Sequence, residues 1–194
     1  GWFNRNEDRE VTILVATSGD TGSAVANGFL GVEGTRVIIL YPKGKVSEVQ
    51  EKQFTTLGQN ITTLEIDGTF DDCQRLVKTA FSDRELTGKL NLSSANSINI
   101  GRLLPQSFYY YYGWAQLKDP EAKPLVCVPS GNFGNLTAGL MAYRSGLPLA
   151  GFVAATNINR VVPDYLETGE FIPRPSIRTL SNAMDVGNPS NLDR

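Results

Sequence analysis

Short apolar runs, rich in β-branched residues, alternate along the chain with longer amphipathic segments. The runs are nearly continuous, with few polar interruptions, which is typical of parallel strands buried on both faces. The pattern predicts five strands, Val11–Ala16, Arg36–Tyr41, Ile61–Ile66, Leu125–Val128 and Gly151–Ala155. It also predicts five helices, Thr21–Leu30, Val46–Leu57, Thr69–Phe81, Asn135–Ser145 and Arg160–Glu167. This repeated β-α-β order predicts a doubly wound α/β fold with parallel sheets.

The alternation pauses over Ser97–Leu117 and resumes at Pro124. That segment is long for one helix, and Pro105 has no amide hydrogen, so we expect a kink or two abutting helices there. With a boundary near Gly101, we expect a smaller α/β lobe over residues 1–100 and part of a larger lobe over residues 101–194. The tail from Phe171 has little periodicity and is predicted to be a connecting segment.

Composition and charge exclude several classes of protein. The 194 residues are 41% hydrophobic and 20% charged, as in an ordinary globular protein. The net charge of -2 leaves no basic excess to hold a nucleic acid or an anionic membrane. No apolar run approaches the ~20 residues of a membrane span, and the first residues are polar. We therefore expect a cytoplasmic protein without nucleic-acid or membrane partners.

Two residue types restrict the chemistry. The chain contains no histidine, which excludes Ser-His-Asp and Cys-His nucleophile pairs and argues against a metal site. Proton transfer must then use a carboxylate, a lysine, a tyrosine or a cofactor. The only cysteines, Cys73 and Cys127, form no CxxC pair and no disulfide framework. Because Cys127 lies in an apolar strand, we expect it to be a buried, inert thiol.

The first candidate site is the segment Ala16–Ser23 (ATSGDTGS), which follows a strand and opens a helix. Its glycines allow a tight turn, and hydroxyls beside free amides at a helix N-terminus bind anions. The alternative is a plain turn in which Asp20 or Thr21 caps the helix without touching a ligand. Four hydroxyl side chains are more than a cap requires.

A second glycine loop, within Pro129–Gly139 (PSGNFGNLTAG), again lies between a strand and a helix. It matches neither the GxGxxG dinucleotide fingerprint nor the GxxxxGK[ST] phosphate loop, so neither NAD nor ATP is favoured. Glycines with asparagines between them suit a phosphate cradle, and ordinary turn chemistry is the alternative. Two such loops at the carboxyl ends of parallel strands favour a ligand crevice.

The third segment, Ser93–Arg102, combines small hydroxyl and amide residues at the end of a strand with an arginine. A guanidinium makes planar, bidentate contacts with phosphate or carboxylate. For Arg102 alone, a surface salt bridge is the competing interpretation.

The aromatic run Phe108–Trp114 (FYYYYGW) covers every face of a helix, so only part of it can face one core. We expect the remainder to meet another subunit or other parts of the same protein. Base stacking is disfavoured because no basic residues are interleaved. Lys43–Lys45 (KGK) is predicted to be a solvated turn.

Six segments in register resemble the threonine synthases: ATSGDTGSAVA, LYPKGKVSEVQ, SSANSINIGRLLPQ, VPSGNFGNLTAGL, AATNINRVVPDYL and LSNAMDVGNPSN. These enzymes use pyridoxal phosphate and have the tryptophan-synthase-β-like fold (fold type II). The resemblance spans about Val11 to Asn191 and implies two lobes of that fold, incomplete at both ends. It also implies conversion of O-phosphohomoserine and water to threonine and phosphate by β,γ-replacement.

The resemblance further implies roles for individual residues. The loop whose amides hold the cofactor phosphate corresponds to Gly131, Asn132, Phe133, Gly134 and Asn135. The cofactor ring hydroxyl would face Asp20. The substrate carboxylate would contact Thr17, Ser18 and Thr21. The substrate phosphate would be bound by Asn96, Ser97 and Arg102.

One departure from the family concerns the lysine that forms the Schiff base with the cofactor. The family places it upstream of the TSGDTG loop, but only sixteen residues precede Thr17 and none is lysine. The family's partner for the pyridine nitrogen lies downstream of this chain. We therefore expect this chain to be an internal fragment that does not catalyse alone. Its expected partners are the missing parts of the same enzyme and, in a homo-oligomer, further copies of that enzyme.

Two other functions stay open. The chain could belong to another fold type II enzyme, such as a serine/threonine deaminase or a cysteine synthase. Deaminases, however, show SGNHAQ-like and GGGGL-like loops, where this chain has SGDTGS and GNFGNL. The third possibility is a non-catalytic phosphate-binding module that kept the fold and lost the lysine.

Overall fold

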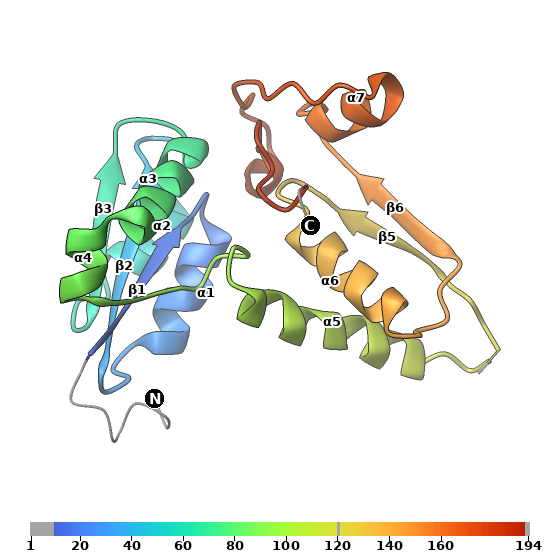
Figure 1. Cartoon of the computed structure of the whole chain (residues 1–194), viewed down its shortest axis with the longest axis horizontal. Coiled ribbons are helices and arrows are strands. Elements are labelled where there is room, and N and C mark those ends of the chain that lie inside the picture. Colours follow the sequence, from blue (N-terminus) through green and yellow to red (C-terminus); the bar gives the residue numbers. More distant parts are fainter. Residues whose placement is uncertain (1–9, 120, 193–194) are drawn as a thin grey trace. The chain divides into compact units, whose positions relative to one another are not determined.

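The computed structural model describes residues 10–119 and 121–192 (Figure 1). The chain divides between Asn96 and Ser97 into two compact units. Each unit contains a parallel sheet with its own helices. All ten predicted elements are present, with bounds within two residues of those predicted, so the doubly wound α/β class is confirmed.

Unit 1 is built on a four-stranded parallel sheet in the order β3-β2-β1-β4. Its strands are β1 (Val11–Ala16), β2 (Thr35–Pro42), β3 (Ile61–Ile66) and β4 (Asn91–Ser94). Its helices are α1 (Asp20–Phe29), α2 (Glu48–Thr55), α3 (Phe70–Ser82) and α4 (Arg84–Lys89). The short β4 and α4 are not among the ten elements that the pattern predicted.

Both faces of this sheet are covered. The chain runs from β1 through β2 to β3 and then returns to β4 on the far side of β1. Right-handed crossovers therefore place α1 and α2 on one face and α3 on the other. Contacts of α1 with α2, and of α3 with β1 and β2, agree with this arrangement. The core between these layers includes Val15, Ile39 and Phe54, each almost fully buried.

Two helices of unit 1 begin with reciprocal capping boxes. At α2, the Ser47 hydroxyl accepts from the Gln50 amide, while the Gln50 side chain accepts from the Ser47 amide. At α3, Thr69 and Asp72 make the same exchange. These side chains satisfy amide groups that the first turn of a helix would otherwise leave without acceptors.

Unit 2 has a two-stranded parallel sheet, formed by β5 (Leu125–Pro129) and β6 (Gly151–Ala155). Its helices are α5 (Ile100–Ala115), α6 (Gly134–Arg144) and α7 (Val161–Thr168), followed by a 3-10 turn, η2 (Asn182–Met184). Within this unit, α5 and α6 pack against each other on one side of the sheet (Figure 1). The predicted connecting segment from Phe171 contains only η2 among its described residues.

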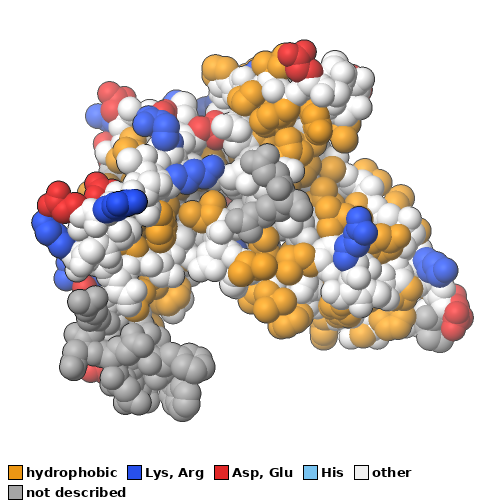
Figure 2. Space-filling view, in the orientation of Figure 1, with side chains coloured by type: hydrophobic (Ala, Val, Ile, Leu, Met, Phe, Trp, Pro, Cys, Tyr) orange, Lys and Arg blue, Asp and Glu red, His pale blue; other side chains and the backbone are white. Residues whose placement is uncertain are grey.

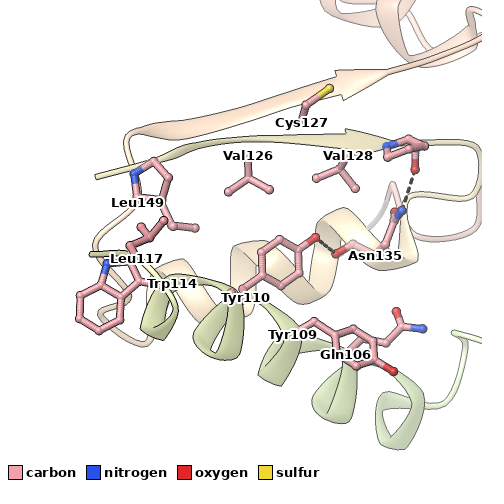
Figure 3. A pocket seen from close by; sticks show the side chains of 13 residues that line it. Gln106, Tyr109, Tyr110, Trp114, Leu117, Val126, Cys127, Val128, Asn135 and Leu149 are labelled. Carbon is pink, nitrogen blue, oxygen red and sulfur yellow. Dashed lines mark hydrogen bonds between the residues drawn. The ribbon is translucent and has the colours of Figure 1, made fainter. Parts of the chain in front are cut away.

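In unit 2, one of the two alternatives expected at Pro105 is excluded, and the expectation for Cys127 is wrong. Ile100–Ala115 is one continuous helix, so two abutting helices do not form, although Pro105 removes the donor for the Gly101 carbonyl. Cys127 is exposed rather than buried. Its strand has the apolar character of a buried strand, but the described helices α5 and α6 cover only one face of β5, and Cys127 lies on the other (Figure 3).

The aromatic run Phe108–Trp114 lies on α5, so some of its side chains are half-buried and others are exposed. Tyr110 is half-buried, and its ring contacts Phe152 edge-on at 6.0 Å between centroids. Phe108, Tyr109 and Tyr112 are exposed. Hydrophobic side chains are prominent on the face of unit 2 that Figure 2 shows. The Lys43–Lys45 turn is solvated, as predicted.

Candidate functional site

The turn between β1 and α1 is organised by the buried side chain of Thr17. Its Oγ1 accepts hydrogen bonds from the amides of Gly19 at 2.9 Å and Gly22 at 2.7 Å. A Cβ at Gly22 would lie 2.6 Å from Thr17 Cγ2, so only glycine lets the helix approach so closely. Thr17 thus shapes the turn from within, and its predicted contact with a substrate carboxylate stays a prediction.

Neither Asp20 nor Thr21 caps α1, so the plain-cap interpretation of these two residues is wrong. The N-cap is Gly19, which has no side chain, and Thr17 supplies the acceptor for the first turn. Asp20 is exposed, and its Oδ1 accepts from Gln50 Nε2 at 2.6 Å. Within the described ranges, no hydrogen bond uses the backbone amides of Asp20 and Thr21. This helix start therefore keeps two backbone donors of the kind that bind anions, and the anion site itself stays a prediction.

Asn96 ends the strand segment of the third candidate site, and its side chain is buried. Its Oδ1 accepts from the Ala16 amide at 2.8 Å, while its Nδ2 donates to the Ala16 carbonyl at 2.7 Å. The side chain thus acts as a polar bridge across the end of β1, immediately before Thr17. The structure gives Asn96 a positioning role in unit 1, and its contact with a substrate phosphate stays a prediction.

The loop Gly131–Asn135 starts helix α6 in unit 2. Phe133, the N-cap residue, has a left-handed backbone with φ 60° and ψ 12°, a conformation uncommon for a bulky residue. No side chain in the described chain caps α6, and its first turn contains no acidic residue. The amides of residues 131–135 donate no hydrogen bond within the described ranges. The loop therefore presents a set of donors at the positive end of a helix dipole.

Side chains from outside the loop hold it in place. Asn132 Oδ1 accepts from the Ser190 amide at 2.7 Å, and the Asn132 carbonyl accepts from Asn191 Nδ2 at 2.8 Å. A Cβ at Gly131 would lie 2.6 Å from Met184 Cα, so the backbones touch there. The segment 184–191, part of the predicted connecting segment, thus supports the loop.

Ser97 lies beside the first turn of α6. Its Cβ is 3.2 Å from the position that a Cβ of Gly134 would take. Its Oγ accepts from Asn191 Nδ2 at 2.7 Å and from Asn132 Nδ2 at 3.3 Å. The structure therefore brings Ser97 together with the Gly131–Asn135 loop.

Arg102 lies in the first turn of α5 and is half-buried. Removal of the guanidinium from water lowers its pKa below the ordinary value, with a small opposing effect from Tyr109. An arginine keeps its charge despite such a shift, and partial desolvation strengthens its attraction for an anion. These features are compatible with a phosphate ligand, and the contact of Arg102 with a substrate phosphate stays a prediction.

A pocket of about 510 Å³ lies between α5 and β5 (Figure 3). Tyr110 and Trp114 on the helix, with Val126 and Val128 on the strand, form much of its wall. None of the residues that line it is charged. Asn135 is the one member of the glycine loop among them; its carbonyl accepts from the Tyr110 hydroxyl at 2.6 Å. This apolar pocket does not suit a phosphate.

The described residues contain no cluster of three or more His, Cys, Asp or Glu side chains arranged for a metal ion. Among the same residues, no helix is both long and apolar enough to cross a membrane.

The family model for pyridoxal-phosphate-dependent enzymes matches residues 2–194. The chain belongs to this family. Its sequence is 55% identical over 189 residues to threonine synthase from Buchnera aphidicola of Acyrthosiphon pisum, covering 97% of this chain and 44% of that protein. The resemblance read from the six motifs is confirmed.

Two solved threonine synthases have a similar structure. The enzyme from Escherichia coli superposes with a TM-score of 0.91 at 57% identity, over 95% of this chain and 44% of that one. The pyridoxal-phosphate-bound enzyme from Brucella melitensis superposes with a TM-score of 0.84 at 41% identity. The match covers 100% of this chain and 42% of that one. These neighbours support fold type II. The chain spans less than half the length of these relatives.

Pyridoxal phosphate is the cofactor of the family, and the residues at the start of α6 fit its phosphate. The loop offers amide donors, an adjacent serine hydroxyl and no carboxylate in the first turn of the helix. Close packing of Gly131 on Met184 and of Gly134 beside Ser97 leaves no room for a Cβ at the first and little at the second. A dianionic phosphate matches this donor set.

Sequence reasoning missed the supporting residues Ser190 and Asn191. Their motif, LSNAMDVGNPSN, contributed to the resemblance, but nothing in its spacing showed that it would fold back onto the glycine loop. Asn191 is also notable because it is buried and its Oδ1 accepts no hydrogen bond within the described chain. Such an acceptor costs about 1–3 kcal/mol until a donor, such as a water carried with a ligand, reaches it.

Proposed function

We propose that this chain is part of a threonine synthase that converts O-phosphohomoserine and water to threonine and phosphate. The observation that carries the proposal is the Gly131–Asn135 loop, an uncapped, donor-rich helix start braced by Asn191 and Met184. High identity to threonine synthases over nearly the whole chain supports the choice among family members.

In this proposal the two loops divide the anions between them. The amides of residues 131–135 bind the cofactor phosphate. When bound, pyridoxal phosphate supplies the electron sink of the reaction. The start of α1, with the amides of Asp20 and Thr21 and the hydroxyls of Ser18 and Thr21, binds the substrate carboxylate, and Thr17 holds the turn in shape. Asp20 faces the cofactor ring hydroxyl.

Arg102 and Ser97 are assigned to phosphate binding in unit 2, while Asn96 positions the end of β1 in unit 1. Arg102 is suited to the substrate phosphate because its guanidinium is partly withdrawn from water and offers paired donors. Assignment of Arg102 to a substrate phosphate favours phosphohomoserine over the non-phosphorylated substrates of the deaminase and cysteine synthase alternatives.

The lysine that binds the cofactor covalently is not among the candidate residues. All seven lysines of the chain are exposed, and none lies in the three candidate segments. We therefore expect the 194-residue chain alone to form no threonine. The full-length protein that carries it would supply the lysine from another segment, and residues 1–100 and 101–194 would contribute to its smaller and larger lobes.

The same proposal includes the cellular location of the enzyme and its protein contacts. The exposed free thiol of Cys127 suits a reducing compartment, which supports a cytoplasmic location. The exposed aromatic residues Phe108, Tyr109 and Tyr112 on α5 are suited to contact other parts of the enzyme or a second subunit.

The deciding experiment follows phosphate release and threonine formation from O-phosphohomoserine by the full-length protein, with and without pyridoxal phosphate. Cofactor-dependent formation of both products in equal amounts is the expected result. A folded, cofactor-loaded protein without turnover would point to a different fold type II substrate. Failure to take up the cofactor would favour the phosphate-binding module instead.

A further inference from the structure

The amide group of Asn191 is oriented by a backbone group, which removes the usual ambiguity between its nitrogen and oxygen. The Asn132 carbonyl can only accept, so the atom 2.8 Å from it must be Asn191 Nδ2. The same nitrogen lies 2.7 Å from Ser97 Oγ. Asn191 therefore donates to Ser97.

The same reasoning fixes Asn132. Its Oδ1 lies 2.7 Å from the Ser190 amide, which can only donate, so Asn132 Nδ2 is the atom that faces Ser97 Oγ at 3.3 Å. Ser97 thus accepts from two amide nitrogens. A hydroxyl has one proton, and no described residue accepts it from Ser97.

The surroundings of Ser97 indicate where its hydroxyl proton can be donated. Ser97 is half-buried against Gly134, where the free amides of α6 begin. Asn191 is itself 4% exposed, and its Oδ1 has no donor in the described chain, so the site still lacks a hydrogen-bonding partner.

We propose that Asn191 is a positioning residue that makes the Ser97 hydroxyl an obligate donor to a phosphate monoester bound at the start of α6. The proposal rests on the function proposed above. Asn191 touches neither substrate nor cofactor; it acts by donating to one lone pair of Ser97 Oγ, while Asn132 donates to the other. The phosphate monoester belongs either to the cofactor or to phosphohomoserine, and the experiment separates the two.

The test uses the full-length protein and the variants Ser97→Ala, Asn191→Ala and Asn191→Asp. Dissociation constants are measured spectroscopically for pyridoxal phosphate and for pyridoxal, which lacks the phosphate. If the cofactor phosphate takes the Ser97 proton, both alanine variants bind pyridoxal phosphate about tenfold more weakly and pyridoxal as before. Asn191→Asp binds pyridoxal phosphate weakest, because the new carboxylate would take the Ser97 proton itself and repel the phosphate.

A second arm measures the KM for O-phosphohomoserine at saturating cofactor. If the substrate phosphate is the ligand, this KM rises about tenfold in the same variants and cofactor affinity is unchanged. The double variant Ser97→Ala with Asn191→Ala should lose no more cofactor affinity, and raise the KM no further, than Ser97→Ala alone. The reason is that the two residues act through one hydroxyl.

Asn188→Ala is the matched control, since Asn188 lies on the same segment and is exposed. Thermal unfolding of every variant separates lost binding from lost folding. Unchanged affinity and KM in the Asn191 variants would overturn the proposal, as would equal losses for pyridoxal and pyridoxal phosphate. A wild-type protein that takes up no cofactor would instead refute the proposed function.

Discussion

The sheets of the two units contain the same kind of apolar strand, yet they differ in burial. In unit 1, Val15 of β1 and Ile39 of β2 are fully buried, because helices cover both faces. In unit 2, Leu125 of β5 is 63% exposed and Val153 of β6 is 44% exposed. A continuous apolar run therefore predicts a parallel strand in both units, but the burial of that strand depends on what covers each face.

The largest contrast should appear in the reactivity of the two cysteines. Cys73 is fully buried in unit 1, and burial raises the pKa of its thiol to about 12. At pH 8 its thiolate is about a thousandfold scarcer than that of an ordinary thiol. A small thiol reagent should label exposed Cys127 at least a thousandfold faster, as measured by mass spectrometry of digested protein over time. Comparable rates would mean that unit 1 opens readily.

Truncation of one apolar strand residue in each sheet should lower the free energy of unfolding by different amounts. Ile39→Ala removes a side chain from the closed core of unit 1 and should cost about 2–5 kcal/mol in free energy of unfolding. Leu125→Ala, on the exposed face of β5, should cost under about 1 kcal/mol. Urea unfolding of each variant provides the measurement. Equal losses would show that the exposed face of β5 is covered in solution.

The buried turn of unit 1 offers a smaller effect. Thr17→Val keeps the shape of the side chain but removes the oxygen that accepts from the amides of Gly19 and Gly22. The variant should lose about 1–3 kcal/mol of stability, since buried donors would have no acceptor. Thr17→Ser, which keeps the oxygen, is the control in the same unfolding experiment. A stable valine variant would show that water replaces the hydroxyl.

The smallest effect concerns the capping box of α3, which has no counterpart at α6. Thr69→Ala should cost about 0.5–2 kcal/mol of unfolding free energy. Hydrogen bonds from Arg75 and then Thr69 lower the pKa of Asp72 to about 2, below its unfolded value. The contribution of Asp72 is therefore present above about pH 4 and is lost as the pH falls toward 2. The stability difference between the wild type and Asp72→Asn should shrink over that interval; a constant difference would contradict the coupling.

The sequence was sufficient for the fold because the fold depends on local signals. Apolar runs, glycine turns and amphipathic segments each lie within a few neighbouring residues, and the elements they predict match within two residues. The loop at Gly131–Asn135 was visible for the same reason. The pattern predicts no bounds for β4, because its sequence NLSS is short and polar for a strand.

Long-range hydrogen bonds account for what could not be predicted. Ala16 is joined to Asn96, eighty positions later, and Ser97 is joined to Asn191, ninety-four positions later. No periodicity encodes such pairs, so the supporting role of Asn191 had to come from the structure. The exposure of Cys127 was missed for a related reason, because the cover of a strand comes from distant elements.

The close approach of chains at Gly131 and Gly187 has a consequence for tolerance to mutation. A Cβ at Gly187 would overlap the Arg174 carbonyl oxygen, and one at Gly131 would overlap the Met184 backbone. Because even the first side-chain atom has no space, the chemical character of the substituent is irrelevant at both positions. In a saturation scan, every replacement there should fail alike, whereas replacements at Asn191 should be graded by their ability to donate a hydrogen bond.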